Sequence, residues 1–148
     1  MDSAAYEEAR LCAHRILRSR EKTSFQLQKR LQELGHSSHA AQQVTNRFVE
    51  VGLVDDKRYT QLYIRSAQAS NKGWRRIRQE LQQRGIAPAE LEALLPPSEE
   101  EELQRAQAVI ARCSIETHKD KEKAFRKLQN KGFSIDIAKQ AIEAVILG

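Results

Sequence analysis

The chain has 148 residues, of which 40% are hydrophobic and 30% charged, with three prolines, six glycines and a formal net charge of +5. A chain of this length buries one core or a short array of small cores, so a large enzymatic architecture is excluded. Helix-forming residues dominate the composition, and we predict an all-α protein essentially without β-structure.

The first predicted helix runs from about residue 4 to residue 20, with Leu11 on its inward face. A shorter helix over residues 25–35 follows, in which leucines recur at i and i+4 and so share one side. Gly35 stands where a left-handed C-cap residue is needed, and a third helix begins near Ser38.

The same order of helices recurs in the next part of the chain. Asp55 can cap a helix over residues 56–70 whose inward side chains are predicted to be Tyr59, Leu62 and Tyr63. A short helix over residues 74–85 ends at a glycine, and Pro88 has the first-turn position of the helix that follows, with Leu91, Leu94 and Leu95 as its apolar face.

The last part of the chain repeats the order once more. Ser98 followed by Glu101 has the capping-box arrangement, and it starts a helix predicted over residues 99–116. A short helix over residues 121–132 again ends at a glycine, and Ser134 has the N-cap position of the final helix.

The three terminating glycines reveal an internal repeat. Gly35, Gly85 and Gly132 are separated by 50 and 47 residues, which is the size of a helical repeat. We therefore predict three tandem three-helix repeats that form an elongated, curved body, with a single globular helical bundle as the alternative. The predicted domains are residues 1–52, 53–97 and 98–148.

Charge alternates in blocks along these repeats. Residues 10–30 hold seven basic side chains against one acid, residues 65–85 hold six against one, and residues 86–104 hold six Glu and no base. Basic blocks suit phosphate groups or an acidic protein surface, although ordinary solvated helix faces have the same composition.

The densest basic cluster consists of Arg75, Arg76 and Arg78. Arg75 and Arg78 share a helix face away from the apolar positions, and guanidinium groups match phosphate oxygens and carboxylates with a rigid fork of donors. We predict contacts with DNA or with a protein partner here, and simple solvation stays open. Further candidates for the same role are Lys72, Lys29, Arg30, Arg126 and Lys127.

Other polar and aromatic features have simpler interpretations. Trp74 is either the first core position of its helix or a platform on which a base stacks. Asp55 and Asp56 are interpreted as helix-capping residues and not as metal ligands, and His36 and His39 as residues of a surface turn. The sequence contains no phosphate-binding loop and no nucleophile motif, so we expect no catalytic residues, no metal and no cofactor.

The cellular compartment is also predicted from composition. No stretch approaches about 18 consecutive apolar residues, and Asp2, Glu7 and Glu8 stand where a secretory signal needs an apolar run. Cys12 and Cys113 are too few for a disulfide scaffold. We expect a cytoplasmic protein without a membrane partner.

The centre of the chain contains LVDDKRY at residues 53–59, KGWRRIRQEL at residues 72–81 and RGI at residues 84–86. In these motifs, in this order and at this spacing, the chain resembles the bacterial RecX family of regulatory proteins. The first and third repeats agree with the family in helical pattern only, and Trp74 departs from the residue that often follows the glycine in related sequences.

The resemblance implies a monomeric protein that binds the RecA recombinase filament on single-stranded DNA. It further implies that binding restrains the ATP hydrolysis, strand exchange and co-protease action of the filament, and so modulates recombination, DNA repair and the SOS response. The alternative is a stand-alone basic helical module that binds DNA directly. The modest net charge and the acidic block at residues 86–104 favour the filament regulator.

Overall fold

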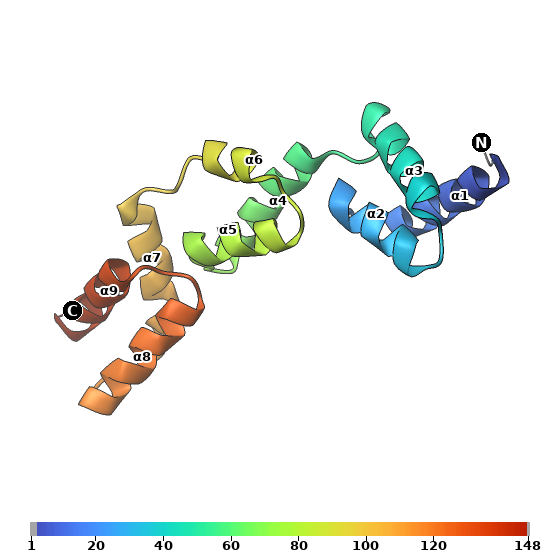
Figure 1. The fold of residues 1–148 in the computed structure, drawn as a ribbon. Coiled ribbons are helices and arrows are strands. Elements are labelled where there is room, and N and C mark those ends of the chain that lie inside the picture. The colour runs from blue at the N-terminus through green and yellow to red at the C-terminus, as the bar shows by residue number, and fades with distance from the viewer. Residues whose placement is uncertain (1–2, 148) are drawn as a thin grey trace. The chain divides into compact units, whose positions relative to one another are not determined.

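The computed structural model describes residues 3–147 and contains nine α-helices and no strand in that range (Figure 1). The prediction of an all-α helical-repeat fold is confirmed. The helices are α1 (Ser3–Ser19), α2 (Ser24–Glu33), α3 (Ser38–Glu50), α4 (Asp56–Ala69), α5 (Trp74–Gln83), α6 (Pro88–Ala93), α7 (Glu99–Ile110), α8 (His118–Asn130) and α9 (Ile135–Leu147).

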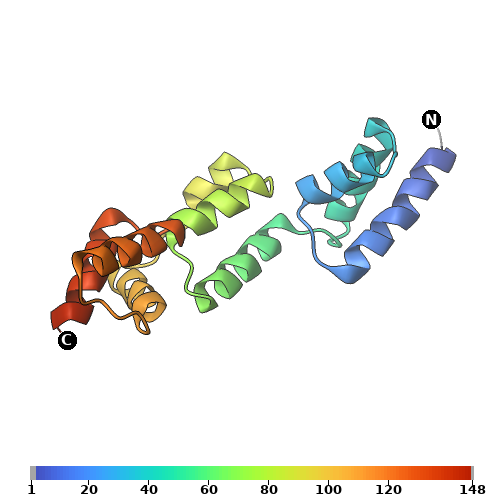
Figure 2. The same cartoon turned by 90° about the horizontal axis from the view of Figure 1, so that it is seen from below.

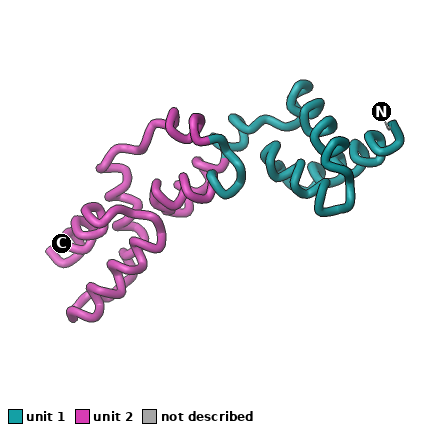
Figure 3. Tube along the Cα trace, viewed as in Figure 1, with its two compact units in different colours: residues 1–62, 82–87 teal, residues 63–81, 88–148 magenta. Residues whose placement is uncertain are grey.

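The internal contacts divide the chain into two compact units (Figure 3). The first unit consists of residues up to 62 together with 82–87, and the second of residues 63–81 together with 88 onward. The division passes through α4 and α5, so the middle set of helices contributes to both units. The division into three repeats at residues 1–52, 53–97 and 98–148 remains a prediction from the sequence.

In the first unit, α3 packs against both α1 and α2 (Figure 2). Alanines on α1 and α3 let these helices approach closely, and larger side chains fill the space between α2 and α3. The fully buried members of this core are Ala9, Ala13, Leu27, Leu31, Ala41 and Val44.

In the second unit, α9 packs along α7 and also contacts α8. The core is again built from i and i+4 positions, which bring apolar side chains of each helix onto one face. Its buried members are Ala106, Ile110, Ala124, Leu128, Phe133, Ile137, Ala138, Ala141 and Ile142.

Helix ends follow the capping residues that the sequence predicted. The backbone N–H of Arg58 donates to the Asp55 carboxylate at 3.0 Å, and Ser98 and Ser134 accept from the first turns of α7 and α9. The three repeat glycines have φ angles between +87° and +101°, the left-handed conformation that a C-cap needs.

In the first unit, the N-terminus of α2 lies against residues of the second repeat. The buried Thr23 caps α2 and also donates its hydroxyl to the Arg84 carbonyl at 2.6 Å. Asp56 accepts from both the backbone N–H and the hydroxyl of Ser24, at 2.7 and 2.6 Å. The Asp56 carboxylate therefore joins the first residue of α2 to α4, a role that the sequence did not predict for it.

Some predicted boundaries are wrong. α7 ends at Ile110 and not near residue 116, and α8 begins at His118, before the predicted residue 121. The predicted extension of α7 followed the apolar periodicity through Cys113, but Cys113 and Ile115 reach the core from a non-helical connection. The early start of α8 is explained by a capping box between Thr117 and Asp120.

Some predicted inward side chains are also wrong. Leu11, Leu62 and Leu95 are 50%, 44% and 89% exposed. Leu11 lies off the buried stripe of α1, and α6 is only six residues long, so it ends before Leu95. Tyr59 and Tyr63 are half-buried, and their hydroxyls accept hydrogen bonds from Arg84 and Lys72.

Candidate functional site

The N-terminal end of α5 contacts the C-terminal end of α8, and both of these helix ends belong to the second unit. The N–H groups of Gly73 and Arg75 donate to the carbonyls of Lys131 and Gly132 at 2.8 and 3.2 Å. The Trp74 N–H donates to the Glu102 carboxylate of α7 at 2.7 Å. Glu102 of α7 and the residues that end α8 thus satisfy three N-terminal donors of α5, and the positive end of one helix dipole meets the negative end of another.

This junction requires two glycines in contact. A Cβ on Gly73 would lie 2.3 Å from the carbonyl carbon of Gly132. Gly132 itself has φ +101°, and a Cβ there would meet Arg76. The two backbones can approach this closely only because neither residue has a side chain.

Two of the three predicted contact arginines of α5 are used inside this junction. Arg75 donates to the Gln129 carbonyl at 3.3 Å, and Arg76 donates to the Asn130 carbonyl at 2.9 Å. Both guanidinium groups therefore cap the last turn of α8, while their side chains stay exposed. Arg78 is exposed as predicted and has no hydrogen bond or ion pair to another described residue.

Lys72 lies apart from this exposed group. Its ammonium contacts the Glu80 carboxylate at 2.9 Å and the Tyr63 hydroxyl at 3.4 Å, and its side chain is only 27% exposed. Glu80 also accepts from Arg76 at 2.8 Å. The surroundings of Lys72 are those of a residue that stabilises the fold, because its charge is already matched by a half-buried carboxylate.

A hollow of about 480 Å³ gathers basic side chains of α5 and α8 in the second unit. We call it the α8 cationic hollow. None of the six described residues that line it is acidic or apolar, and Lys123, Arg126 and Lys127 are exposed without an ion pair to another described residue. Its lining consists of Arg76, Lys123, Arg126, Lys127, Asn130 and Lys131.

The structure thus brings three predicted residues together, Arg76 with Arg126 and Lys127. Sequence reasoning missed Lys123 and Lys131, which complete the hollow. The spacing of Lys123, Lys127 and Lys131 at i, i+4 and i+8 places them along one face of α8 and its C-cap, and this signal was available in the sequence.

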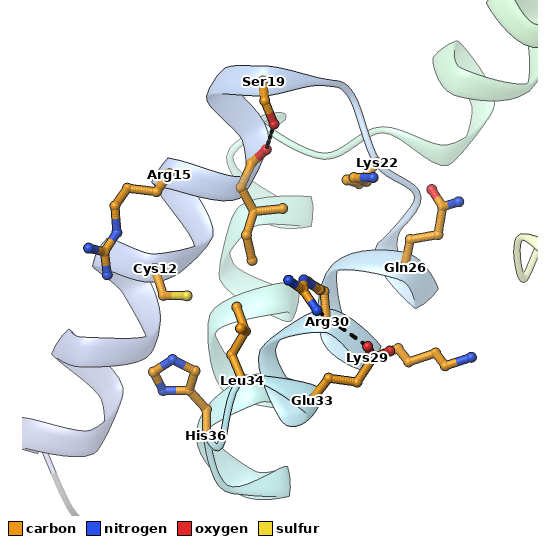
Figure 4. A pocket seen from close by; sticks show the side chains of 11 residues that line it. Cys12, Arg15, Ser19, Lys22, Gln26, Lys29, Arg30, Glu33, Leu34 and His36 are labelled. Atoms are coloured by element: carbon orange, nitrogen blue, oxygen red, sulfur yellow. Dashed lines mark hydrogen bonds and ion pairs between the residues drawn. The ribbon is translucent and has the colours of Figure 1, made fainter.

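The other predicted pair, Lys29 and Arg30, lies in the first unit. Both line a groove of about 770 Å³ between α1 and α2, which Figure 4 shows. We call it the α1–α2 groove. Arg15 and Lys22, which the sequence analysis did not single out, also line it. Its apolar members are Cys12, Ile16 and Leu34, and Ser19, Gln26, Glu33 and His36 complete the lining.

A third hollow, of about 560 Å³, contains Trp74, Arg75 and Arg78. Trp74 lines this hollow and is half-buried, so its position is intermediate between that of a core residue and that of an exposed platform for base stacking. Glu99, Glu102, Asp136 and Glu143 also line this hollow, so its basic side chains are balanced by acidic ones. An anion therefore finds less favourable surroundings here than in the α8 cationic hollow.

Among the described residues of these sites, Glu102 is the one whose pKa is clearly raised, which favours its neutral form. Burial raises its pKa, against the lowering effects of the Trp74 N–H and of Arg105. One of its oxygens lies 3.8 Å from an Arg105 nitrogen, and neither of these two buried atoms has a hydrogen bond. The Glu102 carboxylate therefore stabilises the junction of α5 and α8 by accepting the Trp74 N–H, but the burial of its negative charge costs free energy.

Metal and membrane chemistry receive no support from the described residues. No group of three or more His, Cys, Asp or Glu side chains is arranged to hold a metal ion within residues 3–147. In the same range, no helix is both long and apolar enough to cross a bilayer.

Sequence comparisons identify relatives along nearly the whole chain. A regulatory protein RecX of Halorhodospira halophila is 34% identical over 145 residues, which cover 95% of this chain and 90% of the relative. A regulatory protein RecX of Trichlorobacter lovleyi is 28% identical over 143 residues, covering 90% and 92%. The family model described as "RecX, second three-helix domain" matches residues 55–95.

Solved structures agree in fold. The crystal structure of RecX from Lactobacillus salivarius superposes with a TM-score of 0.80 over 99% of both chains, at 22% sequence identity. Another crystal structure of a regulatory protein RecX gives a TM-score of 0.79 over 94% of this chain and 72% of that one. These likenesses concern the arrangement of helices.

Proposed function

Because this chain belongs to the RecX family of regulatory proteins, we propose that it binds the RecA filament on single-stranded DNA and inhibits it. Inhibition in this proposal covers ATP hydrolysis, strand exchange and co-protease action. The protein acts by binding and not by catalysis, as expected of a family of regulatory proteins. Its net charge of +5 favours association with a filament that contains a polyanion.

The observation that carries the proposal is the α8 cationic hollow. Five basic side chains line it, and three of them, Lys123, Arg126 and Lys127, are exposed and form no ion pair with another described residue. Phosphate oxygens of a DNA strand are the ligand that such a lining neutralises best, because none of its residues is acidic or apolar and only Arg76 among them forms an ion pair with another described residue, Glu80.

The α5 arginines are less suitable as the principal contacts. Arg75 and Arg76 already donate to carbonyls at the end of α8, so their replacement would disturb the fold together with any binding. A test of function should therefore change Lys123, Arg126 and Lys127 to Gln, which removes three charges without removing a capping bond of the junction.

The test is the single-stranded-DNA-dependent ATPase rate of RecA titrated with the protein. We expect the wild-type chain to lower the rate at substoichiometric amounts, and the Lys123→Gln, Arg126→Gln, Lys127→Gln variant to require on the order of tenfold more protein. The matched control replaces three exposed basic residues of the same unit outside the hollow: Arg112→Gln, Lys119→Gln, Lys121→Gln. Equal losses in both variants would contradict a specific role of the hollow.

Binding to a labelled oligonucleotide without RecA separates this proposal from a stand-alone DNA-binding module. The filament regulator is expected to bind naked single-stranded DNA weakly, since an acidic block follows its basic one. Tight binding to DNA alone at physiological salt, with an unchanged ATPase rate of RecA, would favour the module. If the α8 cationic hollow contacts phosphates, the Lys123→Gln, Arg126→Gln, Lys127→Gln variant should bind the oligonucleotide with a weaker salt dependence. We expect the magnitude of the slope d log K/d log [salt] to fall by about 2 units.

A further inference from the structure

The α1–α2 groove differs in chemistry from the α8 cationic hollow. Its floor is apolar: Ile16 and the half-exposed Leu34 face it with the thiol of Cys12, which behaves as a small hydrophobic group. Its edges carry the basic side chains of Arg15, Lys22, Lys29 and Arg30, and α1 and α2 both contribute to the lining (Figure 4).

The electrostatics of the groove favour an anionic occupant. Four basic side chains and one acidic side chain line the groove. The acidic one is Glu33, whose carboxylate lies 3.4 Å from the Arg30 guanidinium. Arg15, Lys22 and Lys29 have no ion pair to another described residue. The partner must therefore carry negative charge at the edges and, to remove Leu34 from water, an apolar group at the centre.

A nucleic-acid strand meets only half of this requirement. Its phosphates match the basic edges, but a sugar–phosphate backbone gains little from an apolar floor. Bases bind such surfaces mainly by stacking on aromatic rings, and the described lining of the groove contains no Trp, Tyr or Phe ring and a single imidazole, that of His36. A peptide with a bulky apolar side chain between acidic ones satisfies both the floor and the edges.

We propose that the α1–α2 groove docks an acidic segment of a protein partner, with one bulky apolar side chain against Leu34. Carboxylates before and after that side chain contact Arg15, Lys22 and Lys29. A volume of about 770 Å³ accommodates an apolar side chain and its neighbours. The assignment deepens the proposed function and rests on it: the α8 cationic hollow contacts DNA, and this groove contacts protein.

The test exploits the apolar floor, because a substitution there leaves the charge unchanged. Leu34→Gln should weaken binding to the RecA–single-stranded DNA filament about five- to tenfold, with binding to the oligonucleotide alone unchanged. The matched control is Leu11→Gln, an equally exposed leucine of the first unit outside the groove, which should leave both affinities unchanged.

Photo-crosslinking in the full-length protein then identifies the occupant. With Leu34→p-benzoylphenylalanine, irradiation on the filament should give a protein adduct whose crosslinked peptide is rich in Asp and Glu around an apolar residue. An adduct to DNA, an adduct to a peptide without acidic residues, or no adduct despite filament binding would overturn the groove assignment. Failure of the wild-type chain to bind the filament would instead overturn the proposed function, and the groove assignment with it.

Discussion

Glu102 shows how a single residue couples the fold of the second unit to pH. Its carboxylate accepts the Trp74 N–H at 2.7 Å, and burial raises its pKa above the ordinary value. A carboxyl whose pKa is higher in the folded state contributes stability that is complete below its unfolded pKa. This contribution is lost as the pH rises through the folded pKa. Ionisation of Glu102 as the pH rises therefore opposes folding.

Replacing Glu102 with Gln should remove this dependence, because the amide oxygen still accepts from Trp74 and does not titrate. We expect the free energy of unfolding of Glu102→Gln, relative to the wild-type chain, to increase between about pH 4 and about pH 7. Urea unfolding followed by circular dichroism at both pH values measures it, with the exposed Glu100→Gln as the control. A relative stability that stays constant over this range, or falls, would show that Glu102 carries no ionisation cost.

At the scale of elements, the repeats are joined through helix ends. In the first unit the N-terminal residue of α2 donates to an acidic side chain of α4, and in the second unit the N-terminal residue of α5 donates to an acidic side chain of α7. In both places the second helix of a repeat also meets the chain around the next repeat's C-cap glycine, Gly85 or Gly132. The recurring glycine thus ends one helix and leaves room for another.

The close contact between the ends of α5 and α8 predicts that a single methyl group added at Gly73 lowers the stability of the protein strongly. Gly73→Ala places a Cβ against the Gly132 backbone at 2.3 Å, and the two helix ends must separate. We expect the free energy of unfolding to fall by about 3 kcal/mol, at the upper end of the usual cost of overpacking. Urea denaturation gives this value.

Gly35→Ala is the matched control for Gly73→Ala, because a Cβ at Gly35 meets nothing within 4 Å. It retains only the cost of a left-handed backbone at φ +97°, about 1 kcal/mol. If Gly73→Ala cost no more than Gly35→Ala, the close approach of the two backbones would not be what holds this junction.

The elements themselves were largely predictable because the signals that set them are local. Capping residues and left-handed glycines act within one turn, so Asp55, Ser98 and Gly132 fixed helix ends from sequence alone. The end of α7 was missed because apolar periodicity does not distinguish a helix from a connection that also covers the core, as Cys113 and Ile115 do.

At the scale of the whole molecule, the candidate sites were only partly predictable. Basic density along the sequence pointed to α5, yet Arg75 and Arg76 are engaged by carbonyls 54 positions further along the chain. Such long-range contacts leave no local signal. The α1–α2 groove was missed as a groove for the same reason, since its floor and edges come from two helices and only Lys29 and Arg30 of α2 stood out in sequence.

The two proposed surfaces lie in different compact units and share no residue, and this independence is itself testable. The free energies that two distant, uncoupled substitutions remove add together, so the corresponding losses of affinity multiply. If the α8 cationic hollow binds DNA while the groove binds protein in one filament, combining Leu34→Gln with the Lys123, Arg126 and Lys127 changes should weaken filament binding on the order of 50- to 100-fold. Fluorescence anisotropy of the labelled filament, measured for the two parents and the combined variant at one salt concentration, closes this cycle. A combined loss no larger than that of the parent that binds more weakly would mean that both sets of changes disturb the same interaction, and it would contradict two independent surfaces.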